Sequence, residues 1–234
     1  MSCLLTITDL WYAYPDGHSA LKGISLHIGP GEKVGLVGSN GAGKSTLLLH
    51  LNGILQGSGE IEVDGHLVVP ENLGPIRSAV GLVFQDPDDQ LFSPTVFEDV
   101  AFGPLYMGLP EEQVRRRVEA ALESVGMEGR SGRVPHRMSL GEKKLVSIAT
   151  VLAMKPRMLA LDEPTAALDA RSRRRLTRVL QQLEETIVVA THDLSFVSEV
   201  LERTIVMDDG RLVADGPTQS ILSDSQLLGE QGLI

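Results

Sequence analysis

Between an apolar run at residues 33–37 and a leucine-rich run at 47–51, the chain carries the sequence Gly38-Ser39-Asn40-Gly41-Ala42-Gly43-Lys44-Ser45-Thr46. It matches the pattern G-x-x-x-x-G-K-[ST] in the order strand, loop, helix. The glycines let backbone N–H groups face phosphate oxygens, and the helix N-terminus adds positive potential. Lys44 neutralises phosphate charge, Ser45 is a ligand for Mg²⁺, and Thr46 adds a hydroxyl near the α-phosphate. We therefore predict a nucleotide phosphate site on this loop.

A second motif places two carboxylates at the end of an apolar strand. The run Met158–Leu161 is followed by Asp162, Glu163 and Pro164, and α/β sheets bind ligands at the carboxyl ends of their strands. Asp162 is suited to the water shell of Mg²⁺, and Glu163 to polarising an attacking water as a general base. The alternative, simple helix-start chemistry, does not explain an acidic pair at a buried strand end.

The periodicity divides the chain into an α/β core and a helical block. Short β-like runs and turns up to about residue 69 predict an antiparallel sheet, and strand-like runs alternate with helical ones after residue 157. Between them, residues 86–155 follow a helical pattern that includes an amphipathic segment at Glu111–Val125. We predict a nucleotide-binding core of residues 1–85 and 156–234, with 86–155 as an inserted helical subdomain.

Composition excludes several classes of protein. The 234 residues include 21 Lys and Arg against 31 Asp and Glu, a net charge of −10, so no overall positive field attracts nucleic acid. The single cysteine, Cys3, forms no intrachain disulfide and fits a reducing compartment. No apolar run reaches the roughly 18 to 20 residues of a membrane helix. The arginine runs at 115–117 and 171–175 lie on amphipathic helices, where we expect solvated faces without a function.

The motifs together resemble the ATPase subunit of ATP-binding cassette (ABC) transporters over nearly the whole chain. The resemblance rests on the phosphate loop, Leu161-Asp162-Glu163-Pro164-Thr165, Ala167-Leu168-Asp169 and Thr191-His192-Asp193. It implies the ABC ATPase fold, a P-loop NTPase (RecA-like) core with an N-terminal antiparallel β-subdomain and an inserted helical subdomain. It also implies ATP and Mg²⁺, a place for Asp169 in the nucleotide site, and a homodimer in which two sites form head to tail.

The resemblance assigns roles to further residues. Met138-Ser139-Leu140-Gly141-Glu142 stands where the family usually has Leu-Ser-Gly-Gly-Gln. Ser139 and Gly141, with Glu142 beside them, would meet the nucleotide held by the opposite subunit. Gln85 would bind Mg²⁺ and sense the γ-phosphate, and His192 would orient the attacking water. Tyr14 stands where the family stacks an aromatic ring on adenine, with Tyr12 and Trp11 as alternatives and packing on the edge sheet as the simpler interpretation.

The segment after Gln85 resembles one branch of the family, the energy-coupling factor (ECF) importers. The likeness extends over residues 81–96, 97–104 and 14–17. In such importers a groove beside Gln85 receives arginine-bearing helices of a transmembrane coupling protein, which works with a substrate-binding membrane component. Opposite charge and an apolar floor for those helices would come from Asp86, Asp88, Asp89, Leu91 and Phe92, although a solvated acidic loop is the alternative. A peripheral position on the cytoplasmic face of the cell membrane follows.

Within that branch, residues 139–144 and the short segment after the last strand resemble the dedicated cobalt or nickel importers more than the vitamin importers. Four alternatives remain open at this stage. They are the ATPase of an ECF vitamin importer, a non-transport soluble ABC ATPase, a regulatory nucleotide-binding module whose altered signature no longer supports turnover, and a P-loop kinase.

Overall fold

The computed structural model describes residues 3–233, and by internal contacts the chain divides into two compact units. The first unit comprises Met1–Leu82, Arg157–Glu163 and Glu184–Ile234, and the second comprises Val83–Pro156 and Pro164–Leu183. The sequence placed residues 164–183 in the core, whereas here they group with the helical block. The reason is that α6 (Ala170–Gln182) packs against α5 (Leu140–Leu152).

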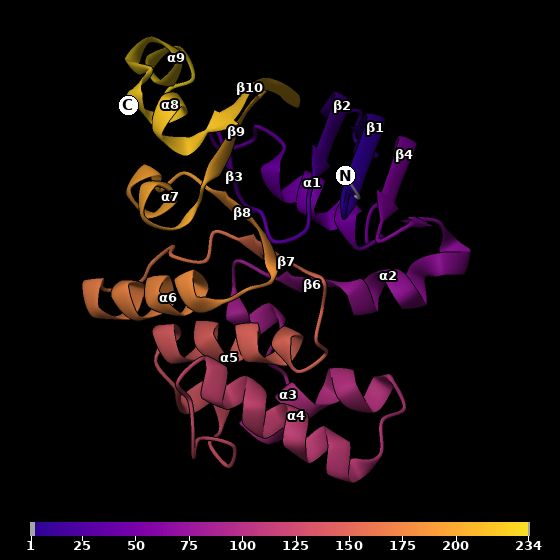
Figure 1. Cartoon of the computed structure of the whole chain (residues 1–234), viewed down its shortest axis with the longest axis vertical. Coiled ribbons are helices and arrows are strands. Elements are labelled where there is room, and N and C mark those ends of the chain that lie inside the picture. Colours follow the sequence, from indigo (N-terminus) through magenta and orange to yellow (C-terminus); the bar gives the residue numbers. More distant parts are fainter. Residues whose placement is uncertain (1–2, 234) are drawn as a thin grey trace. The chain divides into compact units, whose positions relative to one another are not determined.

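The first unit is built on a six-stranded sheet in the order β10-β9-β3-β8-β7-β6 (Figure 1). The strands are β3 (Lys33–Val37), β6 (Val80–Val83), β7 (Met158–Asp162), β8 (Thr186–Thr191), β9 (Arg203–Asp208) and β10 (Arg211–Pro217). Strands β7, β8, β3 and β9 are parallel, and their apolar runs are almost wholly buried, as expected of a parallel sheet covered on both faces. The carboxyl ends of β3, β7 and β8 therefore lie at one edge of the sheet.

Five α-helices lie in the described part of this unit. Helix α1 (Lys44–Leu51) contacts β7 and β8, and α7 (Leu194–Val200) contacts β3. The chain ends in α8 (Thr218–Ser223) and α9 (Ser225–Glu230). A further short helix, α2 (Leu73–Ala79), follows the 3₁₀ turn Pro70–Asn72. The periodicity did not predict α2, because it holds Gly74 and Pro75, and proline is tolerated there only because it lies in the first turn.

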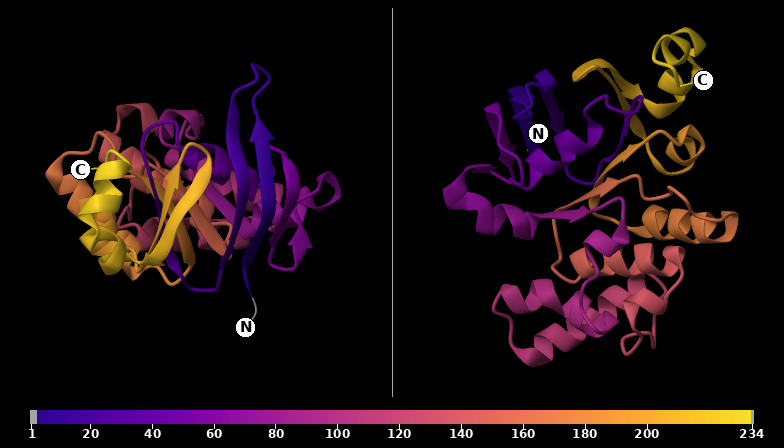
Figure 2. Two further views of the ribbon diagram at one scale, coloured as in Figure 1. Left: turned by 90° about the horizontal axis from the view of Figure 1, so that it is seen from above. Right: turned by 180° about the vertical axis from the view of Figure 1, so that it is seen from behind.

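The antiparallel sheet expected near the N-terminus is present, with strands in the order β2-β1-β4-β5. They are β1 (Leu5–Ala13), β2 (Ser19–Ile28), β4 (Ser58–Val63) and β5 (His66–Leu67). Strands β1 and β2 form the long hairpin seen in the left view of Figure 2. Its turn is closed by the Tyr14 N–H donating to His18 O and the Gly17 N–H donating to Tyr14 O, each at 2.9 Å.

The second unit is helical. Helices α3 (Val96–Tyr106), α4 (Glu111–Ser124) and α5 contact one another, and α6 packs on α5 (Figure 1). Two 3₁₀ turns, Pro87–Asp89 and Pro135–Arg137, precede α3 and α5. Helix α4 is amphipathic, as predicted for Glu111–Val125, and it buries one face, namely Val114, Val118, Ala121 and Leu122. None of the helices among residues 3–233 is long and apolar enough to cross a membrane.

Candidate active site

The loop between β3 and α1 is shaped to receive an anion. Helix α1 begins after Gly43 with no side chain capping its N-terminus and no acidic residue in its first turn. The Lys44 ammonium lies inside the loop and donates to Gly38 O at 2.7 Å and Ser39 O at 3.0 Å. The first N–H groups of α1 are therefore left for a ligand, and the helix dipole favours a negative one.

Two glycines of the loop sit against neighbouring backbone. A Cβ on Gly38 would lie 2.3 Å from Met207 O, and one on Gly43 would lie 2.6 Å from Ala20 O. Gly43 also has φ +99°, a left-handed conformation that side-chain-bearing residues adopt at a cost. The glycines of the motif are thus required by the packing of the loop as well as by a ligand.

Asp162 and Glu163 lie close enough to Lys44 to affect the pKa of its ammonium group. Lys44 is only 6% exposed, and burial lowers the pKa of its ammonium, while the charges of Glu163 and Asp162 raise that pKa in opposition. The parallel arrangement of β3, β8 and β7 explains this proximity, since Lys44 lies on the helix that follows β3, and Asp162 and Glu163 lie at the carboxyl end of β7.

The Glu163 carboxylate is held from both sides by β8 and the residue that follows it. Thr191 Oγ1 donates to Glu163 Oε2 at 3.0 Å, and His192 Nδ1 lies 2.9 Å from Glu163 Oε1. Because a carboxylate only accepts hydrogen bonds, Nδ1 is the protonated nitrogen of the ring. Glu163 is 8% exposed, whereas the His192 side chain is 61% exposed. The pair therefore presents a buried, oriented base beside an accessible imidazole.

The backbone at Glu163 is strained. Its φ of +42° is rare for a residue with a side chain, yet its N–H still donates to Ala190 O at 2.8 Å. Such strain persists only where the surroundings fix it, and it is concentrated at functional sites. Here the positive φ turns the chain at Glu163 away from the direction of β7, which ends at Asp162.

Among the three aromatic candidates, Tyr14 is the one hydrogen-bonded to α1. Its hydroxyl lies 3.0 Å from Thr46 Oγ1, and its ring stacks on His18. Tyr12 packs edge-on against Tyr14 and against His50, while the Trp11 indole donates to Asp9 Oδ1 at 2.7 Å. Tyr14 is thus the aromatic side chain fixed at the start of the phosphate-loop helix.

His50 contacts Tyr12 and Thr46 and was not predicted from the sequence. It is fully buried, its Nδ1 bonds to Thr46 O at 2.7 Å, and burial lowers its pKa. It supports the ring of Tyr12 and the backbone of Thr46 at once. The signal for it was only a polar residue inside the leucine run 47–51, which does not reveal its contacts.

In the second unit, the predicted signature residues form a helix cap. Ser139 Oγ accepts from Glu142 N at 3.3 Å, and Glu142 Oε2 accepts from Ser139 N at 3.0 Å and from Ser139 Oγ at 3.1 Å. This is a complete capping box at the start of α5. The carboxylate of Glu142 thus takes hydrogen bonds that a phosphate oxygen could accept.

Asp169 and Gly141 meet through Ser172. Asp169 is the N-cap of α6 and accepts from Arg171 N, Ser172 N and Ser172 Oγ, which lower the pKa of its carboxyl. A Cβ on Gly141 would lie 2.5 Å from Ser172 Oγ, so a larger residue would force α5 from α6. Asp169, predicted at the nucleotide site, is therefore tied to the start of the predicted signature helix.

The segment after Gln85 is held by a residue that was not singled out. Gln90 accepts from Phe84 N at 3.2 Å and donates to Ser147 O at 2.9 Å and Thr150 Oγ1 at 2.7 Å. These bonds fix the loop against α5 and leave Gln85 itself exposed. An isolated glutamine gives no sequence signal for this anchoring role.

The predicted partner groove needs one correction. Leu91 is 1% exposed and its N–H donates to Pro87 O at 2.9 Å, so it closes the 3₁₀ turn and does not form an exposed floor. Phe92 is 64% exposed and packs edge-on against Phe102. Leu105 and Tyr106 of the same helix are also exposed. Earlier in the same loop, Asp86 and Asp89 are exposed, and Asp88 pairs with Lys143 at 2.6 Å.

The residues present fit a nucleotide with Mg²⁺. The described part of the chain has no cluster of three or more His, Cys, Asp or Glu side chains able to hold a metal alone. Mg²⁺ usually takes one or two protein oxygens and completes its shell with phosphates and water. An exposed Ser45 hydroxyl at the start of α1 and Asp162 at the end of β7 are suited to this.

Known proteins match this arrangement. Residues 21–166 match the family described as ABC transporter. The energy-coupling factor transporter ATP-binding protein EcfA of Methanothermobacter thermautotrophicus is 48% identical over 98% of this chain and 76% of its own length. The structure of cbiO1 from Clostridium perfringens, part of the ABC transporter complex cbiONQ, is 39% identical with TM-score 0.87 over 100% of this chain and 96% of that one. The dimeric ATP-binding cassette MJ0796, bound to ADP and Pi after hydrolysis, is 28% identical with TM-score 0.80 over 92% of this chain and 98% of that one.

Proposed function

The chain belongs to the ABC transporter family, and from this premise we propose that it powers an ECF-type importer of a transition-metal ion, cobalt or nickel, through membrane partners. It is an ATPase that uses ATP and Mg²⁺. The observation that carries the catalytic part of the proposal is the Glu163 carboxylate held between Thr191 and His192, in the electrostatic reach of Lys44. The choice of cobalt or nickel is supported by the resemblance of residues 139–144 to dedicated metal importers.

The residues of the first unit divide the work of hydrolysis. Tyr14 stacks on the adenine, and the loop N–H groups with Lys44 hold the phosphates. Ser45 and Asp162 hold Mg²⁺, which when bound neutralises charge on the β- and γ-phosphate oxygens. Glu163 takes a proton from the attacking water, and the His192 Nδ1–H keeps the carboxylate turned toward it.

A second copy of the chain completes each site. The exposed Ser139 and the buried Gly141 at the start of α5 approach the γ-phosphate bound by the partner's loop, and Asp169 aligns this contact through Ser172. The family resemblance also gives Gln85 a role as a Mg²⁺ ligand. Two sites therefore form head to tail in a homodimer, and hydrolysis removes the phosphate bridge that holds the dimer closed.

The membrane partner docks on the second unit. The proposed docking surface comprises the exposed apolar residues Phe92, Phe102, Leu105 and Tyr106, together with the exposed carboxylates of Asp86 and Asp89 in the loop before Phe92. Exposed aromatic residues beside carboxylates suit an apolar helix that carries arginines. The chain thus binds from the cytoplasmic face of the membrane as a peripheral subunit, beside a transmembrane coupling protein and a substrate-binding component.

Purification of the tagged chain from membranes tests this proposal. We expect integral-membrane proteins to co-purify, and cells carrying the complex to accumulate labelled cobalt or nickel in a manner abolished by Glu163→Gln. Vitamin uptake in place of metal uptake would favour the vitamin importers. A chain recovered without membrane partners would overturn the transport proposal and favour a soluble ATPase or a regulatory module.

A further inference from the structure

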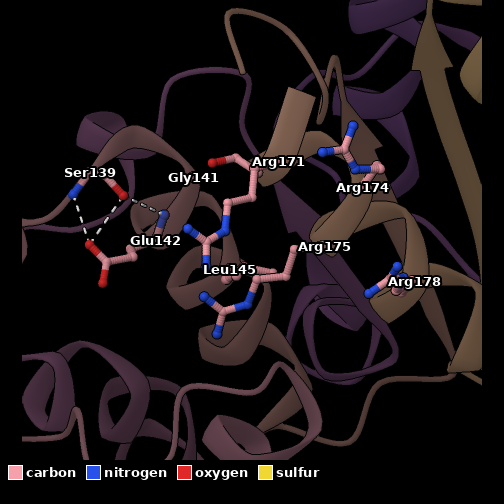
Figure 3. Close-up of a pocket in the computed structure, with 9 residues that line it drawn as sticks. Ser139, Gly141, Glu142, Leu145, Arg171, Arg174, Arg175 and Arg178 are labelled. Atoms are coloured by element: carbon pink, nitrogen blue, oxygen red, sulfur yellow. Dashed lines mark hydrogen bonds between the residues drawn. The ribbon is translucent and has the colours of Figure 1, made fainter. Parts of the chain in front are cut away.

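The charged side chains around the start of α5 are hydrogen-bonded or exposed. Ser139 and Glu142 bond to each other at the edge of a pocket of about 530 Å³ (Figure 3). The other charged side chains that line this pocket are exposed, namely Arg171, Arg174, Arg175 and Arg178. Such groups cost a folded chain little, whereas a buried polar atom without a partner is costly and calls for a physical reason. The helix that follows the phosphate loop contains an atom of this second kind.

That atom is Nε2 of His50, a fully buried residue of α1. Burial lowers the pKa of His50, so its ring is neutral at pH 7. Nδ1 lies 2.7 Å from Thr46 O, and because a carbonyl oxygen only accepts hydrogen bonds, Nδ1 carries the proton. Nε2 is then an acceptor, and among residues 3–233 it has no hydrogen-bond partner. A leucine, such as the neighbouring Leu51, would fill a similar volume without that cost, so packing alone does not account for a histidine here.

The ring of His50 belongs to a closed set of four side chains in the first unit. It packs edge-on against Tyr12, with ring centroids 4.7 Å apart, and Tyr12 packs edge-on against Tyr14 at 5.1 Å. The Tyr14 hydroxyl lies 3.0 Å from Thr46 Oγ1, and the carbonyl of Thr46 accepts from His50. The Tyr14 ring is therefore fixed at its edge and at its hydroxyl, and both contacts lead back to His50.

We propose that His50 is a positioning residue for the nucleotide base, which holds the ring of Tyr14, through Tyr12 and Thr46, in the orientation that stacks on adenine. This inference rests on the proposed function, in which Tyr14 binds the adenine. His50 is fully buried and acts only through its neighbours. A ring that is fixed before the ligand arrives loses less conformational freedom on binding, which raises affinity. The unpartnered Nε2 thus lowers the stability of α1, while the contacts of its ring favour binding of the base.

Calorimetric titration of the full chain with ATP and with inorganic tripolyphosphate, each with Mg²⁺, tests this role. His50→Leu keeps the apolar volume, and Thr46 O keeps the backbone N–H that an α-helix supplies four residues on. We expect ATP binding to weaken about 3–10-fold, the size of a lost aromatic pair, and tripolyphosphate binding to change by less than about twofold because it has no base. The matched control is Leu51→Met, a volume-conserving change at a buried position of the same helix, which should alter neither affinity by more than about twofold. Equal losses for both ligands in His50→Leu would show that His50 only supports the phosphate loop, and would overturn the proposal.

Stability and turnover separate positioning from packing. We expect the urea midpoint of His50→Leu to be no lower than that of the wild type, because the change removes a buried atom that has no partner. In steady-state hydrolysis the KM for ATP should rise with the loss of affinity while kcat stays within about twofold, since Glu163 and Lys44 are untouched. A lower midpoint with an unchanged KM would assign His50 a purely structural role and overturn the proposal.

A double-mutant cycle with Tyr14 tests the route of the effect. We expect Tyr14→Ala to weaken ATP binding at least as much as His50→Leu, and the double variant to lose no more than Tyr14→Ala alone, because His50 acts through Tyr14. Additive losses would overturn the proposal. Unchanged ATP binding in Tyr14→Ala would refute adenine stacking and the role of His50 with it, whereas a loss in Tyr14→Ala without one in His50→Leu would overturn the role of His50 alone.

Discussion

The N-terminus of α1 is predicted to hold a phosphate that the N-terminus of α5 from a second copy also meets, yet the two helix ends are built in opposite ways. Helix α1 starts after a left-handed glycine, has no side-chain cap, and places Lys44 in the loop. Helix α5 starts with a complete capping box in which the Glu142 carboxylate accepts from Ser139. The N-terminus of α1 leaves its N–H groups for an anion, whereas the N-terminus of α5 is already capped by the Glu142 carboxylate.

This difference assigns separate roles to the two units. An uncapped N-terminus with a buried lysine binds phosphate without rearrangement. A capped N-terminus is stable on its own, and under the proposed function it would exchange the Glu142 carboxylate for the phosphate of the partner's nucleotide. We therefore propose that the single chain binds nucleotide and that dimer closure competes with the Glu142 carboxylate.

The largest expected effect concerns the chemistry of the first unit. Glu163→Gln keeps the size of the side chain but removes the base held by Thr191 and His192. We expect single-turnover hydrolysis to slow by about 10²–10⁴-fold, the usual contribution of a general base, with ATP affinity within about twofold. Glu184→Gln, at an exposed position of the same unit, is the control. Hydrolysis that survives in Glu163→Gln would contradict the assignment.

The next effect compares a lysine at the start of each helix. Lys44→Ala removes a buried ammonium from the loop of α1, and Lys143→Ala removes an ammonium that pairs with Asp88 beside α5. We expect the first change to weaken ATP binding to the monomer by about 10–100-fold and the second to leave it unchanged. Fluorescent-nucleotide titration measures both. Similar losses in the two variants would show that nucleotide binding already requires α5.

Much of the fold is readable from the sequence where burial is periodic or continuous. The strand predicted at Lys33–Val37 has those bounds in the structure, and the helix predicted at Glu111–Val125 ends one residue earlier. The ECF and ABC resemblance is likewise confirmed by the matching family and relatives. Strong local patterns suffice for these features because packing reinforces local preference.

Other features depend on contacts between distant residues and could not be predicted. Leu91 looked like an exposed apolar residue but is buried by its own turn, and Gln90 looked unremarkable but ties that turn to α5. The strained backbone at Glu163 is held by a hydrogen bond to Ala190 on another strand. These three features require the tertiary structure. The hydrogen-bond partners that hold Glu163 to β8 and Gln90 to α5 lie 27 to 60 residues away in the sequence, and the Leu91 side chain turns inward.

A pair of glycines tests whether the open end of α1 is a packing requirement. Gly43→Ala meets Ala20 O and must keep φ near +99°, whereas Gly41→Ala has φ +85° but open space around its Cβ. We expect Gly41→Ala to lower the unfolding free energy by about 1–2 kcal/mol from the left-handed backbone alone, and Gly43→Ala to lower it further. Urea unfolding measures the difference. Equal losses would mean that the contact with Ala20 relaxes freely.

A smaller effect is expected when the capping side chain at the N-terminus of α5 loses its negative charge. Glu142→Gln keeps an acceptor for the Ser139 N–H but removes the negative charge that competes with phosphate. In the Glu163→Gln background we expect ATP-driven dimerisation to tighten by about 2–5-fold, the size of one charge at a helix terminus. Glu111→Gln, which removes a first-turn acid from α4, is the matched control. Light scattering against ATP concentration distinguishes them, and weaker dimerisation in Glu142→Gln would make the carboxylate a positive contributor.

The smallest effect is the pH dependence of this same cap. The Ser139 N–H chiefly, with the Ser139 hydroxyl and the charges of Arg133 and Arg130, lowers the pKa of Glu142 from its usual 4.5. A carboxyl whose pKa is depressed by folding stabilises the native state above its unfolded pKa and loses that contribution as pH falls through the folded value. The stability of the wild-type chain relative to Glu142→Gln is therefore constant from pH 7 to about 5 and declines below 4.5.

Urea unfolding at pH 6, 5 and 4 measures this decline. Because acid also releases Ser139 from the Glu142 carboxylate, the dimerisation affinities of the wild-type chain and of Glu142→Gln should become equal over the same pH range. A difference in stability that persists unchanged at the lowest pH would show that Glu142 acts through packing, and α5 would then differ from α1 by shape alone.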